Sequence, residues 1–102
     1  MRHIELDGTK WKSVHEFYDA LLRTLGSPEL HGRNINALVD SMIWGGINRI
    51  SPPYTVRIHG ISSVPKDVRD HIQLARKTIL EARSEFRRLR GSEIDVEFEV
   101  VE

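Results

Sequence analysis

Hydrophobic and polar residues alternate with a period of two in three short parts of the chain. The alternation predicts strands at residues 3–7, 54–59 and 94–100, each with one buried face. The last stretch carries the clearest pattern, because its apolar side chains are interleaved with carboxylates throughout. A sheet of three half-buried strands is therefore expected.

Helical spacing of apolar residues appears between these strands. Ser13 and Glu16 form a capping box before an amphipathic stripe that ends at Gly26, which predicts a helix over about 13–25. Pro65 begins a second such stripe, about 22 residues long, that ends before Gly91. The pattern fits one long helix or two helices with a bend near Asp70.

A further helix is predicted from the cap Asn34 to about Ile43, before the pair Gly45-Gly46. Its apolar stripe lies opposite a polar face. The polar face is formed by Arg33, Asn36 and Asp40, which are spaced at i, i+3 and i+7.

The predicted order is β-α-α-β-α-β, which indicates the α/β class. Helical connections between successive strands favour right-handed crossovers and a small three-stranded parallel sheet. The length of 102 residues allows one domain, 1–102.

Composition narrows the chemistry that this domain can perform. The chain has no cysteine, which excludes disulfides, thiolate zinc sites and cysteine nucleophiles and favours a cytoplasmic location. No phosphate-binding glycine loop and no metal-ligand spacing is present, so we expect no cofactor and no metal. No apolar run suits a signal peptide or a membrane span, so no membrane partner is expected.

The charges balance at 15 basic and 15 acidic residues, but they are unevenly placed. Residues 66–90 carry eight basic and four acidic side chains, whereas residues 91–102 carry five acidic and no basic ones. We interpret the acidic ladder as the solvated face of a strand, where Arg57 can neutralise one carboxylate. Arginines at a helix C-terminus complement its dipole, and the zero net charge disfavours direct nucleic-acid binding.

Polar residues of varied chemistry gather in the segment 28–46. His31 lies just before the helix predicted at 34–43, which carries the polar face, and Trp44 lies just after that helix. Trp44 is expected either in the core or at an interface. An enzymatic alternative would use His31 or His59 with Asp40. The chain shows no complete set of nucleophile, base and orienting group for it.

The stretch at residues 28–40, PELHGRNINALVD, resembles the core motif of the barstar family of ribonuclease inhibitors. The first strand, the capped first helix and the later strand-helix-strand order agree with that family as well. The resemblance covers almost the whole chain. It implies a non-enzymatic protein that blocks a ribonuclease with segment 28–46, where a helix carboxylate takes the place of an RNA phosphate.

The resemblance assigns roles to individual residues. Asp40 matches the phosphate-mimicking aspartate, Gly32 the glycine of close approach, and His31 an aromatic position. Asn36 stands where the prototype has a second aspartate. The implied partner-binding set also includes Arg33, which replaces an acidic residue, Val39, which replaces a tryptophan, and, near the end of the last helix, Glu81 or Glu85. Trp44 is added to this set because of its place beside the glycine pair at the helix end.

Two hypotheses follow from this pattern. The first is an intracellular immunity-type inhibitor of a small ribonuclease or related toxin, with a monomer favoured. The alternative is a barstar-fold interaction module with a non-nuclease partner. Arg33 and Asn36 reduce the negative charge of the predicted binding face, and a basic enzyme is recognised better by a clustered negative face. The identity of the partner therefore stays open.

Overall fold

The computed structural model describes residues 2–28, 31–45 and 47–101. Three parallel strands form one sheet in the order β1-β2-β3. The elements follow one another as β1 (Arg2–Asp7), α1 (Val14–Leu25), α2 (Ile35–Val39), the π-helical turn η1 (Asp40–Trp44), β2 (Tyr54–His59), the 3₁₀ turn η2 (Ile61–Ser63), α3 (Lys66–Arg90) and β3 (Val96–Val101). The predicted α/β fold and its β-α-α-β-α-β order are confirmed.

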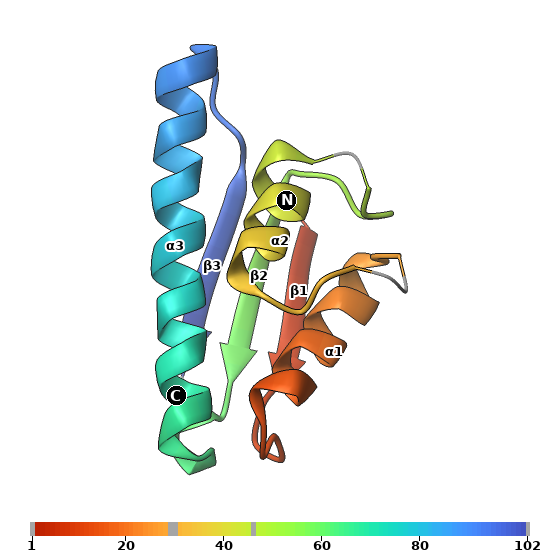
Figure 1. Ribbon diagram of the computed structural model, residues 1–102, viewed down its shortest axis with the longest axis vertical. Helices are drawn as coiled ribbons and strands as arrows, with labels where there is room; N and C mark the ends of the chain where they lie inside the picture. The colour runs from red at the N-terminus through yellow and green to blue at the C-terminus, as the bar shows by residue number, and fades with distance from the viewer. Residues whose placement is uncertain (1, 29–30, 46, 102) are drawn as a thin grey trace.

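The helices cover one face of the sheet (Figure 1). This arrangement follows from the topology, because right-handed crossovers between strands in sequential order place every connection on the same side. The core lies between the two layers. Its fully buried large side chains include Phe17, Tyr18, Leu21, Leu38, Tyr54 and Phe98.

The other face of the sheet carries a row of ion pairs. Arg57 on the central strand lies 2.9 Å from the Glu99 carboxylate and 3.8 Å from that of Glu5. The strand register places these three residues side by side. The predicted neutralisation of the acidic ladder by Arg57 is confirmed.

The third helical region is one continuous helix, α3, of 25 residues. At 1.5 Å per residue it is about 37 Å long, close to the 39 Å longest dimension of the protein. The bend near Asp70 that the sequence also allowed is absent from it. In the described part of the chain, neither α3 nor any other helix has the length and apolar character of a membrane span.

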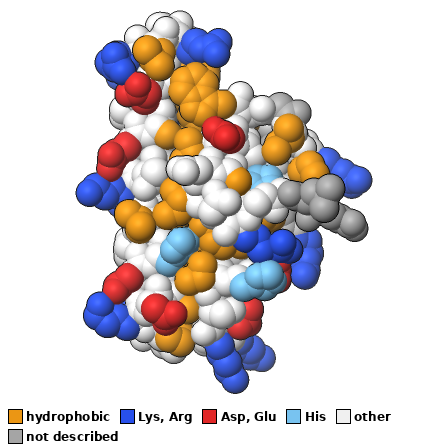
Figure 2. Space-filling model, viewed as in Figure 1, with side chains coloured by type: hydrophobic (Ala, Val, Ile, Leu, Met, Phe, Trp, Pro, Cys, Tyr) orange, Lys and Arg blue, Asp and Glu red, His pale blue; other side chains and the backbone are white. Residues whose placement is uncertain are grey.

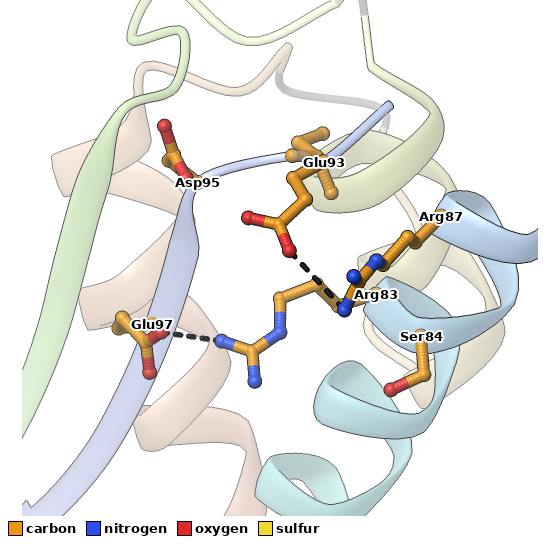
Figure 3. A pocket seen from close by; sticks show the side chains of 7 residues that line it. Arg83, Ser84, Arg87, Glu93, Asp95 and Glu97 are labelled. Carbon is orange, nitrogen blue, oxygen red and sulfur yellow. Dashed lines mark hydrogen bonds and ion pairs between the residues drawn. The ribbon is translucent and has the colours of Figure 1, made fainter. Parts of the chain in front are cut away.

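Contacts between α3 and β3 explain the uneven order of charges along the chain. Arg83 binds the Glu97 carboxylate and Arg87 lies 3.3 Å from Glu93, around a hollow of about 230 Å³ (Figure 3). Arg83 also donates to the Val96 carbonyl of the edge strand at 3.1 Å. The basic segment is therefore folded against the acidic one, and these two ion pairs neutralise part of the dipolar layout.

Two predicted boundaries differ from the structure by two residues or more. The second helix is regular only to Val39 and then widens into η1, so the predicted end near Ile43 falls inside a π-helical turn. The last strand begins at Val96, not at Ile94, because the Val96 N–H bonds back to the Ile94 carbonyl at 3.0 Å in a tight turn. Alternation alone does not reveal such a turn.

His71 gives the fold a pH dependence. Its Nε2 lies 2.6 Å from the Tyr18 hydroxyl between α1 and α3, and burial lowers the pKa of His71 below the ordinary 6.5. The unfolded chain then binds more protons than the folded one below about pH 6.5, so stability falls as the pH decreases through this range.

We expect His71→Gln to reduce this loss, because glutamine keeps a hydrogen-bonding group near Tyr18 without gaining charge. Urea denaturation of both proteins at about pH 8 and about pH 5 measures the effect. The matched variant His15→Gln changes an exposed histidine on the outer side of α1. An equal fall in the unfolding free energy of wild type and His71→Gln would contradict this assignment.

Candidate functional site

The short helix α2 is anchored in the core by Leu38 and presents its polar face to solvent. Asn34 caps it, its Oδ1 accepting the Ala37 N–H at 2.8 Å. Leu38 is the fully buried residue of this helix, whereas Asn36 and the following Asp40 are exposed. The exposed face predicted from the spacing is therefore present.

The π-helical turn η1 continues this face. The Gly45 N–H donates to the Asp40 carbonyl at 2.7 Å, five residues earlier, which is the wide hydrogen bond of a π-helix. Ser41, Met42 and Ile43 are buried within the turn. Asp40 and Trp44, at its two ends, remain exposed; the neighbouring Gly46, predicted to end the helix, lies outside the described residues, as do 29 and 30 of the predicted binding segment.

An open groove of about 540 Å³ lies along the junction of α2 and η1 with α3. Four predicted site residues line it, namely Asn36, Val39, Asp40 and Glu81. Glu85 lines it too, one helical turn after Glu81, and the rest of the α3 wall is Thr78 and Ala82. The sequence left the choice between Glu81 and Glu85 open, and the structure brings both to this groove.

The groove is negatively charged. Within the described residues, the Asp40 and Glu81 carboxylates have no ion-pair or hydrogen-bond partner, and Glu85 is held by Arg88 at 2.6 Å. Several carboxylates elsewhere, such as Glu5 and Glu97, are paired with arginines. Two unpaired acids thus face one open surface.

Arg33 does not cancel this charge locally. Its Nε and Nη2 both lie 2.8 Å from Oδ1 of Asp19 on α1. The hydrogen bond from Arg33 lowers the pKa of the Asp19 carboxyl below its ordinary 3.8, so the pair is charged at neutral pH. The two residues are 14 positions apart, and no local pattern in the sequence predicts this contact.

His31 faces the interior. Its ring Nε2 lies 2.8 Å from Ser41 Oγ and its Nδ1 2.7 Å from the Gly32 carbonyl, with 8% of the residue exposed. Ser41 is buried as well, so this histidine–serine pair ties the loop to η1 in a place closed to solvent. Among the described residues His31 pairs with Ser41 and His59 with Glu5, and neither contacts Asp40 as the enzymatic alternative required.

Gly32 has an internal steric reason to be glycine. A Cβ there would lie 3.0 Å from Nδ2 of Asn34 and 3.2 Å from the Ala37 Cβ. A side chain at position 32 would therefore press on the cap of α2. The resemblance assigned Gly32 to close approach of a partner, and this tight fit is an additional constraint.

Trp44 lies at the surface beyond one end of the groove. It is 38% exposed, its ring centroid lies 5.2 Å from that of Phe86, and the Arg90 guanidinium carbon lies 5.5 Å from the Trp44 centroid. The sequence placed Trp44 at an interface or in the core, and the structure leaves it half exposed. No local pattern predicts that Phe86 and Arg90 pack beside Trp44, because they come from a helix distant in the sequence.

These features define a small α/β domain with an acidic groove between two helical segments. The family model described as barstar, the barnase inhibitor, matches residues 1–101. The chain therefore belongs to the barstar family, as the resemblance indicated. A search of the curated proteins gave no significant match.

Proposed function

We propose that this protein inhibits a small basic ribonuclease or a related nuclease toxin inside the cell that produces it. Segment 28–46 and the groove beside α3 cover the active site of the enzyme, and the Asp40 carboxylate takes the position of an RNA phosphate. The observation that carries this proposal is that two carboxylates, Asp40 and Glu81, lie on the two walls of one open groove and have no ion-pair or hydrogen-bond partner among the described residues.

Electrostatics favours such a partner. A ribonuclease active site binds phosphate with cationic side chains, and a carboxylate fixed on a rigid helix satisfies the same donors. The backbone of Asp40 is held by the bonds of η1 and that of Glu81 by α3, so little backbone freedom remains to be lost on binding. Arg33, in the loop before α2, is paired with Asp19 and so does not neutralise the carboxylates of the groove.

The other site residues support the approach of the enzyme. Val39 and Asn36 line the same groove as the carboxylates and complete a mixed apolar and polar surface. His31 supports the binding surface from the interior, because its buried bond to Ser41 fixes the loop against η1. Family membership adds a general protein ribonuclease partner but not a particular one.

Titration of RNA hydrolysis tests the proposal. Barnase and several other small basic ribonucleases are incubated with increasing amounts of the protein, and cleavage of a fluorogenic RNA is followed. We expect one-to-one loss of activity for at least one enzyme. Absence of both inhibition and binding across the panel would contradict the proposal, and co-purification of an unrelated protein alone would favour a non-nuclease interaction module.

Asn36→Asp tests how the groove attracts its partner. Asn36 lies four residues before Asp40 and lines the same groove, so a carboxylate there strengthens the negative potential. We expect the association rate with an inhibited basic ribonuclease to rise several-fold at low salt, and the gain to shrink as salt screens it. Gln73→Glu, the same chemical change at an exposed position outside the groove, serves as the control in stopped-flow measurements. Equal rates for the two variants would contradict steering by the groove.

A further inference from the structure

We propose that the C-terminal end of α3 provides a second contact for the same ribonuclease, resting on the proposed function. The contact surface consists of Trp44, Phe86, Leu89 and Arg90 and is called the α3-end patch. The α3-end patch binds an apolar side chain of the enzyme that has a carboxylate beside it. None of these α3 residues lines the acidic groove, so the patch enlarges the binding surface beyond it.

The apolar part of the patch is exposed and ordered by ring packing. Trp44 is 38% exposed and Leu89 57% exposed. Phe86 contacts the Trp44 ring and, three residues before Leu89, lies on the same face of α3. Figure 2 shows hydrophobic side chains gathered on this end of the visible face, with charged side chains around them. Exposed tryptophan in a packed cluster is typical of protein interfaces.

Arg90 gives the patch its charge preference. Its guanidinium carbon lies 5.5 Å from the Trp44 centroid and 5.8 Å from the Phe86 centroid. In the described part of the chain it forms no ion pair, whereas Arg83, Arg87 and Arg88 each do. A guanidinium stacked on rings keeps its edge donors available for two parallel bonds to a carboxylate.

The α3-end patch adjoins the acidic groove, and this position favours a protein partner over RNA. The turn η1 has Asp40 at one end and Trp44 at the other, and Glu85 of the groove directly precedes Phe86 of the patch. A polyanion bound at Arg90 would lie beside the carboxylates of the groove and be repelled by them. A protein that presents cations to the groove and a carboxylate to Arg90 matches both parts.

Matched surface substitutions test the patch. Leu89→Ser is compared with Leu74→Ser, because both leucines are exposed on α3, at 57% and 51%, about 22 Å apart along the helix. Arg90→Glu is compared with Lys10→Glu, an exposed lysine far along the chain from the patch. Binding to the ribonuclease that the wild type inhibits is measured by surface plasmon resonance, and circular dichroism confirms that each variant folds.

We expect Leu89→Ser and Arg90→Glu each to raise the dissociation rate at least about tenfold, with Leu74→Ser and Lys10→Glu unchanged. Equal dissociation rates for patch and control variants, with binding still dependent on Asp40, would overturn the patch and leave the proposed inhibition intact. Wild-type binding to none of the enzymes would instead contradict the proposed function itself. Self-association in sedimentation that Arg90→Glu abolishes, with nuclease binding unaffected, would assign the patch to a second copy and also overturn the proposal.

Discussion

Asp40→Ala is expected to weaken binding to the inhibited ribonuclease more than any other single substitution in the groove. Asp40 is exposed, has no partner in the described part of the chain, and is fixed by the first turn of η1. Removing one member of a charge pair buried at an interface costs about 2–5 kcal/mol. This corresponds to roughly 30-fold to several-thousand-fold weaker binding. Most of the loss is expected in the dissociation rate, because the cations of the enzyme are left buried without a partner.

Isothermal titration of wild type and variant against the same enzyme measures this effect. Asp95→Ala is the matched control, because Asp95 is an exposed carboxylate that lines the separate hollow between α3 and β3. Its affinity should remain within about twofold of the wild type, as for most surface changes away from an interface. A loss of similar size in both variants would indicate a general charge effect and contradict the role of Asp40.

Leu38→Ala is expected to destabilise the fold by about 2–5 kcal/mol. Leu38 is fully buried in α2, a helix of five residues that has no other fully buried side chain. A helix this short is marginal without tertiary packing, so its position depends on this contact. The cavity left by the substitution weakens both the core and the attachment of the groove wall.

Urea denaturation followed by tryptophan fluorescence gives the change in unfolding free energy. Asn36→Ala provides the control in the same helix, because the Asn36 side chain is exposed and forms no hydrogen bond within the described part of the chain. It should change stability by no more than about 0.5 kcal/mol. Equal stability of the two variants would show that α2 is held by other contacts.

The fold was largely predictable because its signals are local and repeated. Alternation located all three strands, and the Ser13 box and the Asn34 cap are both present as hydrogen bonds. Spacing also placed Asn36 and Asp40 on one exposed face. These features depend on residues within a few positions of one another, which a single sequence displays directly.

The contacts that shape the site were less predictable, because they join distant residues. The Arg33–Asp19 pair, the His31–Ser41 bond and the packing of Phe86 on Trp44 all depend on tertiary structure. The sequence alone indicates that Arg33 is a cation on the binding face, whereas in the structure Asp19 holds it against α1. The π-helical turn that displays Asp40 and Trp44 was also missed, because its apolar spacing is close to that of an α-helix.

Competition with a nucleotide tests the central proposal most directly, since Asp40 is proposed to occupy the phosphate site of the enzyme. Binding of the protein to the ribonuclease is measured with increasing concentrations of a guanosine monophosphate that fills the active site. We expect the apparent dissociation constant to rise linearly with the concentration of free nucleotide, as it does for two ligands that cannot occupy the same site together. Binding of unchanged affinity to an enzyme saturated with nucleotide would contradict the proposal.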